Sequence, residues 1–390
     1  MNCYIVGYGM IDVLGNNPTE CWSNMLSGNN FSTDIEPLKT ENYKVYRGYK
    51  VDTDSIVMPD NFSPKVIKSL TKAQSMALHA TDQALKMANL PHSSNVAVIV
   101  GTVSNDVEDG PELFTKIINN KRTNPRRLVN RIPDMCPSHI SSHYKFHGHS
   151  VAVYSSCSTG MTAIDYGMYL ADEYDYVIVG GSDAGCNSLA MKYFTQIGAL
   201  ANESIPFDEN RKGFVMGEGA GILIIQSEEQ VEKYKSKPIA KLYKPGKAND
   251  ATDMTSPAPD GIGERISMKK ARENCGNNLI HFVCGHATAT PIGDPIEYNA
   301  VSDILGVTPL WAPKSMIGHT LAAAGALETI YSILCMQNKI IPKIANTKNW
   351  VDPFKMLPRE NVRIKTNETL RTLNNSFGFG GKCTAQVIEL

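Results

Sequence analysis

Short apolar runs rich in Val and Ile recur along the whole chain, and most of them end in Gly or a small polar residue. Several runs are apolar throughout, which is typical of strands buried on both faces of a sheet. Between them lie segments with helical spacing, such as Pro64–Leu90, with one apolar face and one face rich in Lys. This alternation predicts a layered α/β fold in which helices cover the sheets. The expected strands are Cys3–Gly7, Val96–Gly101, Val151–Ser155, Tyr176–Gly181, Gly221–Ile225, Ile280–Cys284 and Thr384–Leu390.

Two of the strand-to-helix turns have the same pattern. In the first, an extended run reaches Cys157 and turns through small residues into the helical stretch Met161–Leu170. In the second, a run reaches His319 and turns into Thr320–Leu334, another helix of small residues. The pattern indicates an internal duplication with one reactive turn in each half, although two such turns would also resemble each other by chance. The polar segment Lys233–Lys247, with two prolines, is the expected boundary between the halves.

Composition limits the class of protein. At about 150 residues per domain, 390 residues predict two to three units or one large α/β enzyme. A hydrophobic content of 42% with 20% charged residues excludes intrinsic disorder. The 38 basic and 39 acidic residues nearly cancel, so no overall field attracts nucleic acid or a membrane surface. Any charged partner must therefore be met by a local patch.

Neither a membrane span nor a secretory signal is expected from the sequence. No run approaches the ~18 apolar residues of a membrane span, and the start has no basic region of a secretory signal. The nine cysteines are scattered and form no Cys-x-x-Cys pair, which favours reduced thiols over disulfides or a zinc finger. We therefore expect a cytoplasmic protein.

Cys157 is the candidate nucleophile. It stands between a strand-like run and a helix start, where unpaired N–H groups and the helix dipole favour the thiolate. The alternative is a buried small hydrophobe, which most cysteines are. Its neighbours, Ser155 to Gly160, are small or polar, whereas a core cysteine is usually flanked by bulky apolar residues.

Two histidines and a lysine follow in the second half of the chain. His286 comes directly after a strand, in a loop of small hydroxyl residues, prolines and an Asp. His319 lies 33 residues later, and Lys314 precedes it by five. Taken singly, each His is more often a satisfied structural group. Together with a strand-to-helix cysteine, they form a set able to carry out thiol-based acyl transfer.

The glycine-rich segment Phe377–Gly381 can bring backbone N–H groups close to a ligand, or it can be an ordinary hairpin turn. A metal site is not expected, because no carboxylate or thiol at suitable spacing completes a site with the histidines of residues 139–149. Nucleotide binding is not expected either, since there is no P-loop and no Gly-x-Gly-x-x-Gly after a strand.

The ordered set of motifs resembles the β-ketoacyl-acyl-carrier-protein synthases, the condensing enzymes of the thiolase superfamily. The resemblance extends over nearly the whole chain, and each motif is modest alone but specific in combination. The matching segments are Ile5–Gly9, Ser156–Gly160, Pro206–Gly221, Asp253–Pro257, Gly285–Glu297, Lys314–His319 and Phe377–Gly381. The resemblance implies the duplicated thiolase fold, an α/β fold of five layers, α-β-α-β-α, with halves at 1–235 and 236–390.

The resemblance also implies roles for the matching residues. Cys157 would take the acyl group from acyl-carrier protein as a thioester. His286 and His319 would bind the malonyl group, promote its decarboxylation and stabilise the enolate, with N–H groups suited to developing oxygen charge. Lys314 would position and charge this pair. The backbone N–H groups of Cys157 and Phe379 would form the oxyanion hole, and Phe379 would gate the second substrate.

Further expectations concern the carrier and its arm. Thr288 and Thr290 would hydrogen-bond the pantetheine arm, and no cofactor is expected beyond the phosphopantetheine that carries the substrates. Carrier proteins are acidic, so a basic surface would bind them, although each of these residues could equally lie on an ordinary solvated helix face. The residues expected to dock the carrier are Lys65, Lys68, Arg126 and Arg127. The expected partner subunit is a second copy or a related ketosynthase-family chain.

Some positions depart from the family pattern and favour a specialised polyketide or polyene pathway over core fatty-acid synthesis. Ala287 and Ala289 stand where Gly is usual, Lys382-Cys383 replaces Thr-Asn, and Asp253 stands where His is frequent. Residues 101–106 lack the glycine pair found near the acyl pocket of housekeeping enzymes.

Three functions remain open at this point. The leading one is an elongating ketosynthase that condenses an acyl chain with malonyl-carrier protein and releases CO₂. The second is a subunit of a ketosynthase heterodimer, active only with a chain-length-determining partner or acting as that partner; Cys157 argues against the non-catalytic role. The third is a thiolase, which would need a second catalytic cysteine, and Cys383 follows the C-terminal glycines instead of preceding them.

Overall fold

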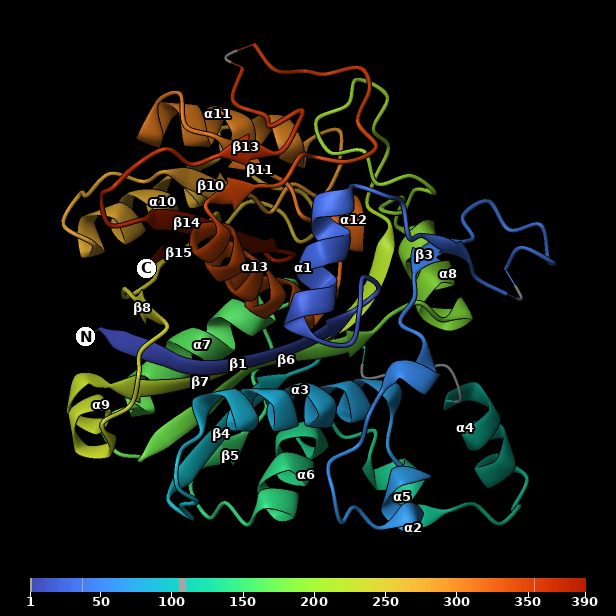
Figure 1. The fold of residues 1–390 in the computed structure, drawn as a ribbon. Coiled ribbons are helices and arrows are strands. Elements are labelled where there is room, and N and C mark those ends of the chain that lie inside the picture. The colour runs from blue at the N-terminus through green and yellow to red at the C-terminus, as the bar shows by residue number, and fades with distance from the viewer. Residues whose placement is uncertain (1, 37, 105–109, 354) are drawn as a thin grey trace.

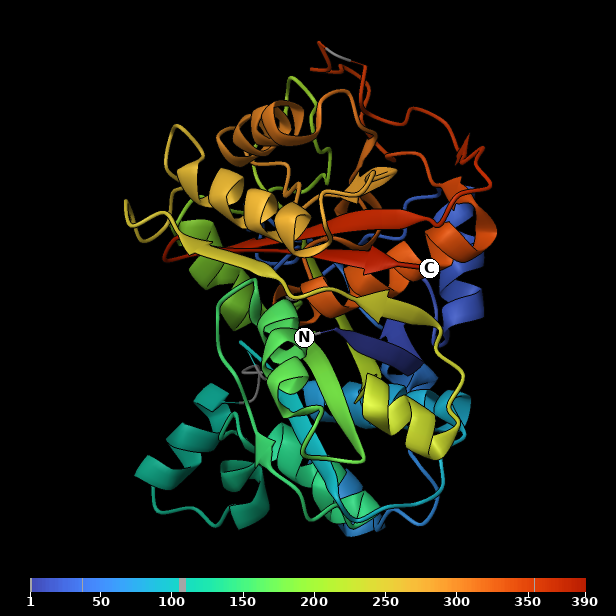
Figure 2. The same ribbon diagram turned by 90° about the vertical axis from the view of Figure 1, so that its left-hand side faces the viewer.

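Five layers stack in the order helix, sheet, helix, sheet, helix, as Figure 2 shows from the side. The computed structural model describes residues 2–36, 38–104, 110–353 and 355–390, so Asn105 and Asp106 of the expected acyl-pocket departure lie outside the described residues. The layered α/β architecture predicted from strand and helix alternation is confirmed.

The first sheet is covered on its outer face by α3 and α6 (Figure 1). Its long strands are buried along their whole length, which explains their near-continuous apolar sequences. β1, β7 and β6 are antiparallel neighbours, and β4 runs parallel to β6. In spatial order its strands are β1 (Cys3–Asp12), β7 (Met216–Ser227), β6 (Tyr176–Ala184), β4 (Val96–Gly101) and β5 (Ser150–Val151), and its outer helices are α3 (Lys72–Ala88) and α6 (Met135–Tyr144).

The second sheet lies on the other side of the middle layer and is covered by α10 and α11 (Figure 2). β10 is parallel to both of its neighbours, whereas β14 and β15 form an antiparallel hairpin through the C-terminal glycines. Its strands are β11 (Leu310–Trp311), β10 (Phe282–Cys284), β14 (Arg371–Gly378), β15 (Lys382–Glu389) and β9 (Gly246–Asn249), and its helices are α10 (Ile262–Asn274) and α11 (Gly293–Leu305).

The middle layer contains α7 (Thr159–Leu170) and α13 (Ala324–Asn338), the helices that follow the two reactive turns. Their first turns touch through glycines. A Cβ on Gly160 would lie 2.7 Å from the Ala322 carbonyl oxygen, and one on Gly325 would lie 2.9 Å from the Met161 nitrogen. The small residues in both predicted helices therefore have a packing reason, since they let the two turns meet at the centre of the molecule.

One short strand joins the two sheets. β8 (Ala240–Leu242) lies in the segment expected to separate the halves, yet it pairs antiparallel with both β1 and β15. Backbone hydrogen bonds therefore run without interruption from one sheet into the other. The division at 235/236 stays a prediction.

Several sequence-based element boundaries were wrong, and three of them have a clear physical reason or consequence. The single helix expected over Pro64–Leu90 is two, α2 (Pro64–Ile67) and α3, because Thr71 forms a capping box with Gln74 and starts a new helix. The strand expected over Val151–Ser155 ends at Val151, where the chain turns toward Cys157. The helix expected over Thr320–Leu334 begins with a 3₁₀ turn and extends to Asn338.

The remaining elements connect these layers at their edges (Figure 1). They are α1 (Pro18–Ser27), β2 (Thr33–Asp34), β3 (Arg47–Tyr49), the 3₁₀ turns Thr53–Ser55 and Leu321–Ala323, α4 (Gly110–Ile118), α5 (Pro125–Val129), α8 (Ser188–Gln196), α9 (Glu228–Tyr234), α12 (Lys314–Ile317), β12 (Ile340–Ile341) and β13 (Val362–Arg363). No described helix is long and apolar enough to cross a membrane.

Candidate active site

One cavity of about 390 Å³ opens beside the first turns of α7 and α13. It brings together residues that are up to 226 positions apart in the sequence, from Cys157 to Cys383. Of the residues expected to act in catalysis or to bind the arm, those that line it are Cys157, His286, Thr288, Thr290, His319 and Phe379. Lys314 lies directly behind His286, with 3.4 Å between its Nζ and His286 Nδ1. The catalytic set expected from the sequence is therefore assembled in one place.

Cys157 sits on a tight turn two residues before α7. Ser156 adopts a left-handed φ of 49°, which reverses the chain after the extended run. The Ser376 hydroxyl donates to the Cys157 carbonyl oxygen at 3.2 Å, so the turn is tied to β14. This hydrogen bond holds Cys157 close to the glycine-rich loop that contains Phe379.

The thiol of Cys157 is protonated at neutral pH. Burial raises the pKa of Cys157 to about 11, while the positive charge of Lys314 and the N–H groups of Phe379 and Cys157 lower it only partly. The prediction that the helix start would favour the thiolate in the free protein is wrong, because desolvation outweighs these N–H groups. Any reaction of this thiol must include the loss of its proton.

His319 occupies the matching turn in the second half. Gly318 before it has a φ of 66°, as Ser156 has a left-handed φ before Cys157. The His319 backbone is fixed to the start of β7: its N–H donates to the carbonyl of Val215, just before the strand, at 2.8 Å, and its carbonyl accepts from Gly217 N–H in the strand at 3.0 Å. Leu321 N–H donates to His319 Nδ1 at 3.3 Å, so the proton of the neutral ring is on Nε2. That Nε2 is buried and has no hydrogen-bond partner among the described residues.

His286 is held from two sides. Its backbone N–H donates to Glu297 Oε1 at 2.8 Å, which fixes the loop after β10. Its Nδ1 faces the Lys314 ammonium group, which can only donate, so this ring also carries its proton on Nε2. The centres of the His286 and His319 rings are 5.4 Å apart and the rings are nearly perpendicular.

Both imidazoles are neutral. Burial lowers the pKa of His286 and of His319 well below the usual value, and the positive charge of Lys314 lowers both further. The cavity therefore presents two neutral Nε2–H donors. Such donors stabilise an oxygen that gains negative charge, and they cannot accept a proton at the same nitrogen.

Lys314 is buried in an ion pair with Glu328, which lies in α13. Every residue of α13 from Ala324 to Met336 is buried, so Glu328 is a single carboxyl group in an otherwise apolar or weakly polar helix. Burial raises the pKa of Glu328 to about 7 despite the ammonium group. This pair fixes the position of the Lys314 charge beside His286.

Sequence analysis missed the two supporting carboxylates. Glu297 accepts from the N–H groups of His286 and Ala287 and from the Asn375 amide. It appears in the sequence only as part of the His286 loop. Glu328 had a signal of its own, since an isolated charge in an apolar helix needs a buried partner.

The residues that depart from the family pattern have a visible structural effect. Ala287 and Ala289 both adopt left-handed φ values, 33° and 61°, and both are buried. Each such residue costs about 1 kcal/mol relative to Gly. The Ala287 N–H bonds Glu297 and the Ala289 carbonyl accepts from Gly213, which holds the strained loop in place.

The glycine-rich loop is anchored without the usual Thr-Asn pair. The Gly380 N–H donates to the Met254 carbonyl at 2.8 Å, and the Asn249 amide donates to the Gly380 carbonyl at 2.7 Å. Cys383 lines the cavity wall but is buried, and burial raises the pKa of its thiol far above the usual value. It has none of the features of a second nucleophile.

The four candidate docking residues lie apart from the cavity lining, on α2, the residue after it, and α5. These elements are side by side, because the Asn130 amide after α5 donates to the Ser69 carbonyl after α2 at 2.7 Å. Lys65, Lys68 and Arg126 are exposed, and Arg127 is half-buried.

Two of the histidines of residues 139–149 make hydrogen bonds to other side chains. His139 bonds the Asn130 side chain at 2.8 Å, and His149 bonds the Tyr166 hydroxyl at 3.4 Å. Among the described residues, no group of three or more potential ligands could hold a metal ion.

Comparison with known proteins identifies the family. The family models described as "Beta-ketoacyl synthase, N-terminal domain" and "Beta-ketoacyl synthase, C-terminal domain" match residues 2–231 and 240–348. The chain is 31% identical to a 3-oxoacyl-[acyl-carrier-protein] synthase 2 of Staphylococcus aureus, over 97% of this chain and 98% of the relative. The chain belongs to the β-ketoacyl synthase family, whose members are acyl-transferring condensing enzymes.

Solved ketosynthases share the fold. The ishigamide ketosynthase/chain length factor has a TM-score of 0.88 and 25% identity, covering 100% of this chain and 98% of that one. The ketosynthase in complex with its acyl-carrier protein AntF, from a type II polyketide synthase, has a TM-score of 0.86 and 23% identity, with coverage of 100% and 98%. The predicted family and the predicted thiolase-type fold are both confirmed.

Proposed function

We propose that the chain catalyses the decarboxylative Claisen condensation of an acyl group on Cys157 with malonyl-acyl-carrier protein, giving 3-oxoacyl-carrier protein and CO₂. One observation carries the proposal: two neutral Nε2–H donors, from His286 and His319, share a cavity with the Cys157 thiol. A hydrolase would need a base beside the thiol, whereas these rings are arranged as donors.

The first step is thioester exchange. Cys157 sulfur bonds the acyl carbon, the bond from that carbon to the arm sulfur breaks, and the thiol proton passes to the departing arm thiol. The N–H groups of Cys157 and Phe379 hydrogen-bond the oxygen as it gains charge, in the manner of an oxyanion hole. Both N–H groups already lie within reach of the Cys157 sulfur.

The second step is condensation. The malonyl carboxylate leaves as CO₂, and its electron pair forms an enolate whose oxygen accepts from His286 and His319 Nε2–H. The enolate carbon attacks the acyl carbon, the bond to Cys157 sulfur breaks, and the sulfur takes a proton from the solvent. Lys314 is a positioning residue here, since its charge keeps both rings neutral and its contact fixes the His286 tautomer.

This chemistry requires no cofactor beyond the phosphopantetheine arm that carries each substrate, because protein N–H groups take the negative charge at each step. Thr288 and Thr290, whose hydroxyls are 3.3 Å apart at the cavity wall, would bind that arm. The curated relative is named for an acyl-carrier protein substrate, which supports a carrier protein as donor. We assign the chain to the cytoplasm, together with its acyl-carrier protein.

Within this function, a specialised polyketide or polyene pathway is the favoured setting. The strained Ala287 and Ala289 alter the loop beside the substrate, and the ishigamide ketosynthase/chain length factor is a structural neighbour. The alternative, a subunit active only in a heterodimer, is supported by exposed apolar residues next to the cavity. Tyr193 is 64% exposed on α8 and Tyr154 is 63% exposed, and the edge strand β5 has a free side in the described chain. A homodimer or a related ketosynthase-family partner would cover this face.

Intact mass spectrometry tests the proposed function. Incubation with a panel of acyl-carrier proteins is expected to add the mass of one acyl group to the protein, and addition of malonyl-carrier protein should remove it and yield 3-oxoacyl product. The acyl group that the protein prefers distinguishes a role in fatty-acid synthesis from one in polyene or polyketide synthesis. If no donor acylates the protein alone but one does in the presence of a neighbouring ketosynthase-family chain, the heterodimer is the active form.

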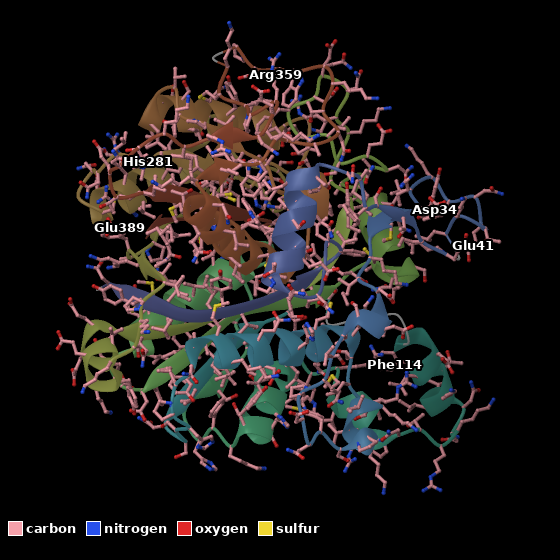
Figure 3. All side chains as sticks on the ribbon, in the orientation of Figure 1. Asp34, Glu41, Phe114, His281, Arg359 and Glu389 are labelled. Carbon is pink, nitrogen blue, oxygen red and sulfur yellow. The ribbon has the colours of Figure 1, made fainter. Side chains whose placement is uncertain are left out.

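Charge reversal at the proposed docking surface should weaken carrier binding. We expect Lys65→Glu/Lys68→Glu to raise KM for acyl-carrier protein about tenfold at low salt, with little change in kcat and a smaller effect at high salt. The substitutions leave exposed apolar side chains unchanged, such as Phe114 on α4, which Figure 3 labels and which is exposed.

The matched control is Lys237→Glu/Lys269→Glu, which makes the same change in net charge at two exposed lysines on other elements. Steady-state kinetics with the carrier-bound substrate and with a small acyl thioester separate docking from chemistry. An equal loss in both double variants would assign the effect to net charge and remove Lys65 and Lys68 from the docking surface.

A further inference from the structure

Glu264 is a buried carboxyl group in the wall of the active-site cavity that the proposed reaction does not use. It lies in the first turn of α10, is 3% exposed, and lines the same cavity as Cys157, Thr288 and Thr290. Its Oε2 has no hydrogen-bond partner among the described residues. Only His319 Nε2 and Asp294 Oδ1 share this condition among the side chains that line the cavity within the described chain.

The neighbouring groups do not compensate Glu264. Asp250 already accepts from the Thr252 and Ala258 N–H groups, and Glu297 accepts from the His286 loop and Asn375. Both therefore add negative charge beside Glu264 without donating to it. Arg265 is the adjacent cation, but its guanidinium group bonds Asp303 and the Asp260 carbonyl.

The pKa of the Glu264 carboxyl group reflects its burial and its acidic neighbours. Burial, with the charges of Glu297 and Asp250, raises the pKa of Glu264 to about 7, although its own backbone N–H group and the charge of Arg265 lower it. Cys383 packs against the same turn, since a Cβ on Gly263 would lie 2.7 Å from its sulfur, and it provides no charge. A buried carboxyl oxygen with no donor destabilises a fold, so a protein that keeps one has a use for it.

The pantetheine arm supplies the missing donor. The Thr288 and Thr290 hydroxyls, which are proposed to bind the arm, line the same cavity as Pro257 and Glu264. Its hydrogen-bond donors are two amide N–H groups and a hydroxyl. A carboxyl oxygen accepts a hydrogen bond in either protonation state, and the ionised form accepts more strongly.

We propose that Glu264 is a specificity-determining residue that accepts a hydrogen bond from an amide N–H of the pantetheine arm. This rests on the proposed function, because the arm belongs to the carrier-bound thioester substrate. The consequence is that this chain discriminates pantetheine thioesters from simple thioesters through a side chain on α10 in addition to the two threonines.

The test compares two thioesters of the same acid, acyl-pantetheine and the acyl S-ethyl thioester, as donors to Cys157 in the full-length protein. For Glu264→Met, which matches the size of Glu without an acceptor, we expect KM for acyl-pantetheine to rise about tenfold with little change in kcat. Reaction with the S-ethyl thioester should be unchanged. Glu264→Gln keeps a carbonyl acceptor and should stay within about threefold of the wild-type KM.

Thermal unfolding gives an independent readout. Removal of an unpartnered buried carboxyl should leave Glu264→Met as stable as the wild type or more stable, although it binds the arm less well. If Glu264→Met lowers the melting temperature and impairs both thioesters equally, Glu264 is structural and the proposal is wrong. An unchanged KM for acyl-pantetheine in Glu264→Met, or in Glu264→Ala should the Met variant not fold, also overturns it. Failure of the wild-type protein to accept any thioester would instead contradict the proposed function.

Discussion

Cys157→Ala is expected to abolish acylation and to lower condensation by at least about 10³-fold, while malonyl-carrier protein is still decarboxylated. The reason is that an Ala side chain cannot form the bond to the acyl carbon. The two Nε2–H donors of His286 and His319 are held by Lys314, Leu321 and the Glu297 loop, none of which depends on the Cys157 side chain.

Two assays on one preparation check this result, intact mass after incubation with acyl-carrier protein and release of labelled CO₂ from malonyl-carrier protein. Cys383→Ala is the matched control, because it removes another buried thiol from the same cavity wall and should leave acylation intact. Condensation at the wild-type rate by the Cys157 variant would refute the acyl-enzyme mechanism.

Lys314→Met is expected to damage both stability and activity. The unpaired Glu328 left in the core costs about 3–5 kcal/mol of unfolding free energy, since Glu328 is completely buried in α13. Activity should fall by at least about 100-fold, because the His286 ring loses the contact that fixes its tautomer.

A second variant separates the two effects. Lys314→Met/Glu328→Met replaces the buried ion pair by apolar groups of similar size and should recover most of the stability, while its activity stays at the reduced level of Lys314→Met. Denaturant unfolding and condensation assays measure this split. Recovery of activity together with stability would show that Lys314 acts only through the fold.

The pH profile of the double variant gives a further check. The charge of Lys314 lowers the pKa of His286 and of His319, so its removal raises both. Each imidazole then takes up a proton at a higher pH than in the wild type. The acid side of the decarboxylation profile should therefore move to higher pH, and a profile identical to that of the wild type would contradict the positioning role.

Most of the candidate site could be predicted because its residues stand at strand ends and sharp turns with small neighbours. The turn at Cys157 and the loop at His286 have such sequences, and the structure brings them into one cavity. The resemblance to condensing enzymes supplied the roles, whereas the residues alone left a buried hydrophobe and ordinary histidines as alternatives.

The parts that could not be predicted depend on contacts between distant segments. The thiol pKa of Cys157 is set by desolvation in a cavity built from both halves, which no local pattern reveals. Glu264 lies on the face of α10 toward the cavity, and its lack of a partner is visible only once Asp250 and Glu297 are in place. Similarly, the break between α2 and α3 follows from one capping box, which outweighs the helical periodicity around it.

The short strand β8 links the unfolding of the two sheets. Leu242 pairs with Cys3 in β1 and with Ile388 in β15, so one residue holds the first and last strands together, about 10 Å apart across two strand spacings. If the three residues of β8 detached from β1 and β15, each sheet would gain an unpaired edge. Unfolding that begins at β8 therefore exposes an edge of each sheet at the same time.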